Sequence, residues 1–208
     1  MKIIVDTEYT TDVGWRDSGW SGPGQHREIV QIAAIAVDDE FRELANFDLL
    51  IRPRINARLS ELFTELTHIP QETVDREGLD FAEALGLFFE FCGHGSTPVI
   101  CMNGDEAVFR ENCALTRNVF PFPNPFHRLD PFLLSLGIEV DSSGDLHKLT
   151  RTPLSGHTHN ALHDVRSMAK WLAEAQTAGV FVTLDALPTE LPAFDRRSRK
   201  SQPRRLEN

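Results

Sequence analysis

One short stretch of the sequence gathers side chains that titrate near neutral pH or bind metals. Residues 156–168 read GHTHNALHDVRSM. Within eight positions this stretch holds His157, His159, His163 and Asp164. These side chains could bind zinc, act as a catalytic pair or lie on the surface without a chemical role. The outcome depends on the helix that the following residues predict, because a helix directs only some of them to the same point.

Carboxylates that could meet at one point come from three separate segments. Asp6 and Glu8 lie two residues apart in a strand-like run, so their side chains leave the same face, about 6–7 Å apart at the backbone. Asp105 follows another strand-like run, and Asp164 falls in the first turn of the last predicted helix. Because open α/β sheets bind ligands at the carboxyl ends of their strands, we expect the four carboxylates to converge.

Such a cluster indicates metal ions. Carboxylates beside a core repel one another and lose hydration unless cations are present. Oxygen ligands favour Mg²⁺ or Mn²⁺ over zinc, and two such ions about 3.5–4 Å apart can hold a phosphodiester for in-line attack. Each aspartate taken alone is better explained as a helix cap or a surface group, and Asp105 in particular as an N-cap. Only the set indicates chemistry.

The histidine before the last helix is the candidate general base. Asn160 is the expected N-cap of a helix from about residue 161 to residue 178. Asp164 then points away from the apolar stripe of this helix, and His159 can lean over the same site. A neutral imidazole can accept a proton from water, so we expect activity to fall below about pH 6 as the ring is protonated.

The other two histidines admit a zinc alternative. His163 lies four residues after His159, a spacing that zinc sites use on helices, but His159 is expected to precede the helix. We therefore expect His157 and His163 to lie at the surface or to support the site from behind.

The composition suits one globular domain with a substantial core. The 208 residues are 41% hydrophobic and 25% charged. No run approaches the length of a transmembrane helix and no signal peptide is evident, so we expect a cytoplasmic protein with no membrane partner. We place the domain at residues 1–180 and a C-terminal extension at residues 181–208. The three cysteines lack the CxxC spacing of zinc sites and are expected to pack in the core.

Charge is unevenly spread along the chain. The net charge is −10, yet residues 195–208 hold six Arg or Lys against two acidic residues. Proteins that grip long duplexes through phosphates are usually basic, so any contacts with nucleic acid must be short or metal-assisted. We expect the tail to be either a disordered, solubilising end or an electrostatic arm.

The order of the predicted elements indicates an α/β fold. Strand-like runs occupy residues 1–9, 27–39 and 41–53, and the short turn between the last two predicts an antiparallel pair. The long Gly- and Ser-rich loop at 10–26 between the first two runs carries Trp15 and Trp20. Helical patterns then alternate with strand-like runs, which predicts a mixed sheet flanked by helices.

Three motifs resemble those of a known enzyme superfamily. VDTEY at 5–9, NGDEAVF at 103–109 and HNALHD at 159–164 resemble the motifs of the DnaQ-like DEDDh 3′–5′ exonucleases, including the five-residue separation of His and Asp. The resemblance covers roughly residues 1–178 and implies a ribonuclease-H-like fold, with antiparallel first strands followed by parallel ones.

The resemblance also implies roles for individual residues. It implies that His159 is the general base and that two Mg²⁺ or Mn²⁺ ions bind to Asp6, Glu8, Asp105 and Asp164. Sliding the second motif by one position offers Glu106 instead of Asp105, but Asp105 immediately follows the Gly that ends the strand. The expected pocket for a 3′-terminal nucleotide is lined by Thr7, Tyr9, Leu66, Thr67 and Asn103.

A closer branch is suggested by further stretches. REIVQIAAIAV at 27–37, the segment 50–75 with RP, LS and TELT, and FAEALGLFFEFC at 81–92 are similar to enhanced-RNAi-type exoribonucleases. This similarity implies a single-stranded substrate, with RNA favoured over DNA, and release of nucleoside 5′-monophosphates. The family usually has Gly where this chain has His68, which puts the turn beside the terminal nucleotide in question, since Gly adopts positive φ without cost.

Other readings share part of this evidence. An HD-type phosphohydrolase would use His163 and Asp164 as metal ligands, but that architecture is helical and the first half of this chain is rich in strands. A DNA-directed proofreading or repair exonuclease would share every catalytic residue. A non-catalytic nucleic-acid-binding module on the same fold would have lost a ligand, whereas all five residues are present. The two loop tryptophans either stack on substrate bases or pack the loop down.

Overall fold

A central sheet of five strands organises the molecule. The computed structural model describes residues 1–180 and 182–189. The strands are β1 (Lys2–Tyr9), β2 (Ile29–Val37), β3 (Glu43–Leu50), β4 (Val99–Cys101) and β5 (His127–Arg128). Their order is β3-β2-β1-β4-β5, with β1–β2 and β2–β3 antiparallel and β1–β4 and β4–β5 parallel. The predicted mixed sheet, antiparallel first and then parallel, is confirmed.

Strand β1 lies in the middle of the sheet because it is apolar on both faces. Ile3 and Val5 pack into one hydrophobic cluster, whereas Ile4 packs into a second cluster on the opposite face. Strands buried on both faces read as continuous apolar runs. The alternation continues beyond this run, so Asp6 and Glu8 leave the sheet on the side of Ile4.

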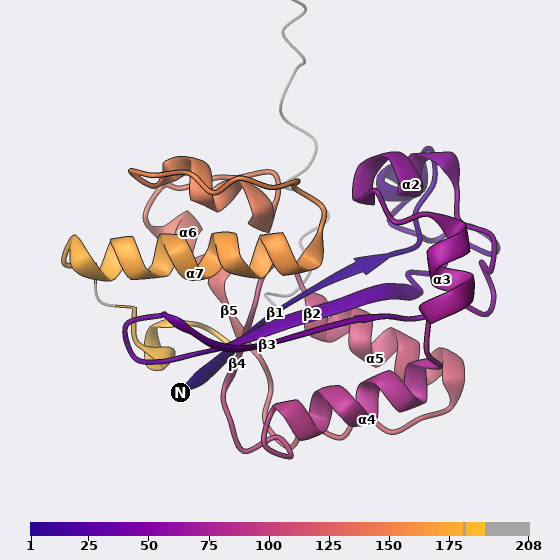
Figure 1. The fold of residues 1–208 in the computed structure, drawn as a ribbon, viewed down its shortest axis with the longest axis horizontal. Coiled ribbons are helices and arrows are strands. Elements are labelled where there is room, and N and C mark those ends of the chain that lie inside the picture. The colour runs from indigo at the N-terminus through magenta and orange to yellow at the C-terminus, as the bar shows by residue number, and fades with distance from the viewer. Residues whose placement is uncertain (181, 190–208) are drawn as a thin grey trace, which may run out of the picture.

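Helices cover the two faces of the sheet (Figure 1). Helices α4 (Phe81–Phe91) and α5 (Asp105–Thr116) pack on one face through a phenylalanine-rich cluster. Helices α6 (Leu129–Ser135) and α7 (Ala161–Thr177) cover the other face. The last helix begins and ends close to its predicted bounds, and Asn160 is its N-cap as predicted, with Oδ1 accepting a hydrogen bond from the His163 N–H at 3.1 Å.

Short helices surround the end of β1. Helices α2 (Glu61–Thr67) and α3 (Gln71–Glu77) lie beyond the tip of the β1 arrow (Figure 1) and pack around Val30 in a small third cluster. The loop after β1 contains α1 (Trp15–Ser18), and a 3₁₀ helix runs over Ser143–Leu149.

The predicted C-terminal extension lies only partly within the described residues. Leu187 is buried in the cluster beneath α7, and the Arg128 N–H donates to the Pro188 carbonyl at 2.8 Å. A second 3₁₀ helix spans Leu184–Ala186. The basic tail 195–208 lies outside the described residues, so its expected disorder and its role as an arm stay predictions, as does a domain boundary at residue 180.

Two further expectations concern the whole chain. Cys92, Cys101 and Cys113 are free and buried, which confirms their assignment to the core. Within residues 1–180 and 182–189, no helix is long and apolar enough to cross a membrane.

Candidate active site

Acidic side chains from distant segments meet at the carboxyl end of β1. The Ser143 hydroxyl donates to Asp6 Oδ1 at 2.9 Å and lies 3.3 Å from Asp164 Oδ2, so one serine links the two aspartates. One potential ligand atom from each of Glu8, His159 and Asp164 lies within 4.8 Å of the others. The expected convergence of these residues is therefore present in the structure.

The fourth carboxylate joins from α5, but not in the position expected of a cap. Asn103 and Gly104 both adopt positive φ, at 56° and 90°, and Gly104 is the N-cap of the helix. The prediction that Asp105 is the N-cap is wrong, because this two-residue turn places Asp105 in the first helical position. Its side chain is buried, and Oδ1 accepts a hydrogen bond from the Thr7 hydroxyl at 2.7 Å. Glu106, the alternative ligand, instead binds Arg110 and the Phe126 N–H.

A buried glutamine brings the start of α7 to this point. Gln31 lies opposite Glu8 in the β1–β2 ladder. Its Oε1 accepts a hydrogen bond from the Ala161 N–H at 3.1 Å, and its Nε2 donates to Asp48 at 2.8 Å. The first N–H groups of a helix have no partner within the helix, so Gln31 satisfies one of them while fixing α7 against β2.

Burial disfavours charge on all four carboxyl groups, and repulsion between the carboxylates adds to this effect at two of them. Burial, then the neighbouring carboxylates, raises the pKa of Asp6 and Glu8 well above their usual range. Burial likewise raises the pKa of Asp105 to about 7 and that of Asp164 to about 6. Among the described residues, Asp105 Oδ2 and Asp164 Oδ1 are buried without a hydrogen-bond partner. Oxygen atoms left free in a cluster of like charges suit divalent cations such as Mg²⁺ or Mn²⁺.

His159 is held beside the carboxylates in an uncommon conformation. Its φ is 70°, in the left-handed region, which costs roughly 1–3 kcal/mol for a residue other than Gly. Its backbone N–H points to Asp164 Oδ2 at 3.4 Å. Burial lowers the pKa of the His159 imidazole, and His157 and Arg16 add to this effect. The ring is therefore neutral at neutral pH, as a general base must be.

The other two histidines do not assemble a zinc site. His163 is buried against His147, with ring centroids 5.1 Å apart. His157 is exposed and stacks on His68. Neither joins a group of three potential metal ligands within the described part of the chain. Their predicted places, at the surface and behind the site, agree with this arrangement.

The residues predicted to contact a terminal nucleotide are differently placed. Thr7 and Thr67 are buried, and both hydroxyls are already used, that of Thr67 by the Phe63 carbonyl at 2.9 Å. Asn103 is exposed, and Tyr9 and Leu66 are half-buried. Only the last three offer side-chain surface to a ligand.

The turn after Thr67 keeps the shape that glycine would give it. His68 is the C-cap of α2 with φ 58° and ψ 22°, and its N–H donates to the Thr64 carbonyl at 2.9 Å. The replacement of Gly by His therefore leaves the left-handed turn in place.

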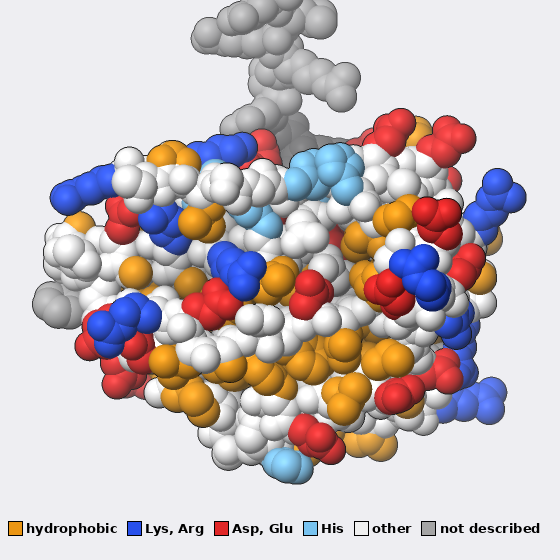
Figure 2. Space-filling view, in the orientation of Figure 1, with side chains coloured by type: hydrophobic (Ala, Val, Ile, Leu, Met, Phe, Trp, Pro, Cys, Tyr) orange, Lys and Arg blue, Asp and Glu red, His pale blue; other side chains and the backbone are white. Residues whose placement is uncertain are grey.

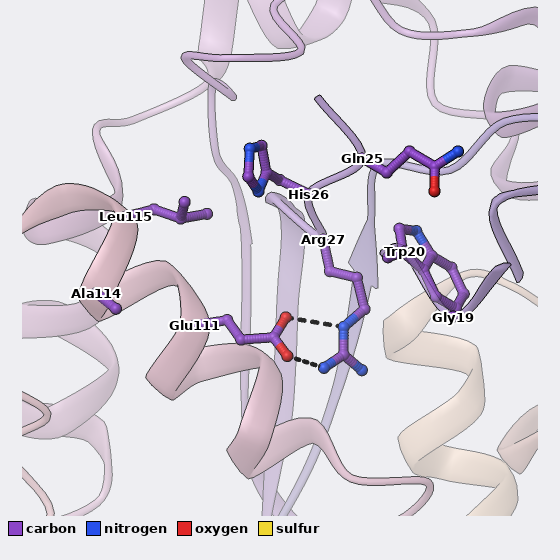
Figure 3. A pocket seen from close by; sticks show the side chains of 8 residues that line it. All are labelled: Gly19, Trp20, Gln25, His26, Arg27, Glu111, Ala114 and Leu115. Atoms are coloured by element: carbon purple, nitrogen blue, oxygen red, sulfur yellow. Dashed lines mark hydrogen bonds and ion pairs between the residues drawn. The ribbon is translucent and has the colours of Figure 1, made fainter. Parts of the chain in front are cut away.

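The loop after β1 lines part of two hollows. One, of about 380 Å³, is lined by Trp20 and by the ion pair of Arg27 with Glu111 (Figure 3). The Trp20 indole donates to the Thr10 carbonyl at 3.2 Å and packs edge-on against Tyr9, with centroids 5.6 Å apart. Trp15 lines a second hollow of about 510 Å³. Trp20 is thus fixed in the loop, and both tryptophans line open space.

The residues that support the cluster carry no recognisable sequence pattern. Ser142, Ser143 and Gly144 precede and begin a 3₁₀ helix and carry no motif. A Cβ on Gly144 would lie 2.3 Å from Asp164 Oδ1, so glycine is required where the backbone passes the carboxylate. The sequence pattern did not predict Gln31 either, because it lies in an apolar strand and nothing local marks its partners.

Comparisons with known proteins agree on one family. The model of the RNase_T exonuclease family matches residues 3–172. The 3′–5′ exonuclease crn-4 of Caenorhabditis elegans is 24% identical over 90% of this chain and 66% of its own length, so the chain spans just under two thirds of that relative.

Solved structures share the fold. The nuclease domain of 3′hExo, a DEDDh family member bound to rAMP, superposes with a TM-score of 0.75 at 19% identity, covering 91% of this chain and 96% of that domain. Escherichia coli exonuclease I in complex with a dT13 oligonucleotide superposes with a TM-score of 0.64 at 16% identity. The match covers 84% of this chain and 40% of the exonuclease I chain. The expected ribonuclease-H-like fold and DnaQ-like resemblance are confirmed.

Divalent cations are expected to stabilise the protein more at high pH than at low pH. The folded carboxyl groups of Asp105 and Asp164 bind protons more tightly than in the unfolded chain, where the usual value is 3.8. The free energy of unfolding should therefore fall as pH rises from about 4 to about 7. Mg²⁺ should raise the melting temperature more at about pH 8 than at about pH 5, as thermal scans would measure. In Asp105→Asn the pH slope should flatten; an equal Mg²⁺ effect at both pH values would contradict the metal site.

Gly144→Ala is expected to weaken metal binding without unfolding the protein. The added Cβ displaces the Asp164 carboxylate, so the Mg²⁺-dependent rise in melting temperature should shrink. Gly86→Ala is the matched control, because its Cβ meets nothing within 4 Å in the middle of α4. An unchanged Mg²⁺ titration in Gly144→Ala would show that Asp164 does not contribute to the site.

Proposed function

Because the chain belongs to the RNase_T exonuclease family, we propose that it is a 3′–5′ exonuclease that shortens single-stranded nucleic acid with the help of Mg²⁺ or Mn²⁺. It removes the 3′-terminal nucleotide and releases a nucleoside 5′-monophosphate. The observation that carries this proposal is the single buried cluster formed by Asp6, Glu8, Asp105 and Asp164 with His159 beside it. A non-catalytic binding module would have no use for so costly a cluster.

The four carboxylates would hold two divalent cations, at positions that the protein scaffold sets. Two divalent cations bound there would lower the pKa of a water molecule and stabilise the leaving oxygen during in-line attack. The Ser143 hydroxyl contacts both Asp6 and Asp164 and fixes their side chains relative to each other. The Thr7 hydroxyl donates a hydrogen bond that fixes the Asp105 side chain. This preorganisation spares the site from rearranging when the scissile phosphate arrives.

His159 accepts the proton of the attacking water. It lies next to Glu8 and Asp164 and is half-buried. Since burial lowers its pKa below the usual 6.5, activity should decline only when the pH falls below that value. Above its pKa the ring is neutral and competent.

RNA is the proposed substrate. The segments that resemble enhanced-RNAi-type exoribonucleases support this choice, as does the likeness to a nuclease domain bound to a ribonucleotide. A DNA-directed exonuclease is the second candidate, favoured by the likeness to an exonuclease bound to a DNA oligonucleotide. Both candidates share every catalytic residue, and the 2′-hydroxyl is the group that distinguishes their substrates.

The terminal nucleotide is proposed to lie between β1 and the end of α2. Tyr9, Leu66 and Asn103 contact it through their exposed surfaces, while Thr7 and Thr67 act by holding the walls of the pocket in place. The hollow lined by Trp20 is suited to the base of a neighbouring nucleotide, because an indole supports stacking with any base. Contacts of this short kind, together with cations, are compatible with the net charge of −10.

Removal of the catalytic groups should have graded effects. Asp6→Ala and Asp164→Ala are expected to abolish Mg²⁺-dependent release of mononucleotides. His159→Ala is expected to lower the rate by roughly 10²–10⁴-fold and to remove the decline in rate at low pH. His94→Ala is the matched control, because His94 is an exposed histidine that also has positive φ, at 55°. Unchanged turnover in Asp164→Ala would refute the assignment of this site.

The direction and the substrate can be read from one assay. Purified protein with Mn²⁺ is incubated with RNA and DNA oligomers of the same sequence, labelled at either end, and the products are resolved by length. Shortening from the 3′ end, faster for RNA, is expected. Faster digestion of DNA would select the second candidate, and internal cuts or shortening from the 5′ end would contradict the proposal.

A further inference from the structure

Two exposed histidines join the end of α2 to the segment that precedes α7. The imidazole rings of His68 and His157 stack in parallel, with centroids 3.7 Å apart and an interplanar angle of 6°. His157 Nε2 also lies 2.7 Å from the Leu66 carbonyl oxygen. Since a carbonyl oxygen can only accept, Nε2 carries the proton of this hydrogen bond. One side chain thus makes a stack and a hydrogen bond to the end of α2, 91 positions away in the sequence.

The stack connects two segments with different tasks in the proposed reaction. His68 directly follows Leu66 and Thr67, which line the proposed nucleotide pocket. His157 lies two residues before His159, the proposed general base. Figure 2 shows histidine side chains gathered on the surface between α7 and α2, where these segments approach each other.

The contact is not explained by the core of the protein. Both rings are exposed. His68 holds a left-handed conformation that glycine would adopt without strain, so a side chain is kept there despite a conformational cost. His159, on the other segment, is also left-handed. A strained conformation persists where the surrounding structure fixes it. Here the segment that carries His159 packs against the turn that carries His68, through His157.

We propose that His68 and His157 form a clasp that positions His159. The clasp, defined as the stacked pair with its hydrogen bond to Leu66, closes the 155–160 segment against the wall of the nucleotide pocket. It rests on the proposed exonuclease function, in which His159 must lie within hydrogen-bond reach of the attacking water. Both histidines are positioning residues and touch no reacting atom.

Loss of the clasp should affect kcat more than KM. The carboxylate cluster and the nucleotide pocket bind the substrate without it, whereas proton transfer depends on the exact placement of one ring. A displacement of about 1 Å in a catalytic group can cost on the order of 10²-fold in rate. We therefore expect kcat to fall about tenfold to a hundredfold while KM changes little.

The test separates the two rings from the backbone that carries them. His68→Gly removes one ring and keeps the left-handed turn. His157→Ala removes the stack and the hydrogen bond, and His157→Phe restores only the stack. Each of the first two variants should lower kcat, the double variant should be no worse than His157→Ala alone, and His157→Phe should recover part of the rate. His94→Gly, an exposed histidine remote from the clasp, should leave kcat unchanged.

A second measurement does not depend on catalysis. Hydrogen exchange of the peptide covering residues 155–160 should be faster in His68→Gly and in His157→Ala than in the wild type. Additive losses in kcat, or a loss confined to KM, would overturn the clasp. Unchanged hydrogen exchange in both variants would also overturn the clasp, whether or not the protein is active. A wild-type protein that releases no mononucleotides would instead reject the proposed function.

Discussion

The structure depends on holding four like charges together in a buried place. Burial raises the pKa of Asp6, Glu8, Asp105 and Asp164, and the neighbouring carboxylates raise the pKa of Asp6 and Glu8 further. A cluster of this kind opposes folding in the absence of cations. The same repulsion favours the binding of divalent cations, because the folded protein already holds the carboxylate ligands close together. Stability and metal binding are thus two sides of one arrangement.

The four carboxylates are carried by a strand and two helices and not by loops. Two of the carboxylates project from the central strand, and the other two lie in the first turns of α5 and α7, where the helix dipole favours negative charge. Gln31 ties α7 to β2, and Ser143 links Asp6 of β1 to Asp164 of α7. Where the backbone must bend sharply around the cluster, it adopts positive φ at Asn103, Gly104 and His159. Strain is concentrated where the geometry is most demanding.

The surroundings of the cluster are compatible with contacts to only a few nucleotides of a single-stranded nucleic acid. A net charge of −10 is poorly suited to long contacts with phosphates, whereas cations and aromatic surfaces need no basic groove. Trp15 and Trp20 line separate hollows next to the end of β1, and the His68–His157 pair joins the end of α2 to the segment before α7. Substrate choice then rests with these walls, since the catalytic groups are common to enzymes that act on RNA and on DNA.

Sequence alone determined the elements and the chemical groups, because those depend on local patterns. The alternation of a strand predicts that Asp6 and Glu8 share a face, and the cap and stripe of α7 predict where Asp164 points. Only the tertiary structure decided that Asp105 follows a cap instead of forming one, that Ser143 reaches Asp6 over 137 positions, and that His157 stacks on His68. These contacts join segments remote in the chain, and their partners are selected by packing, which no local spacing encodes.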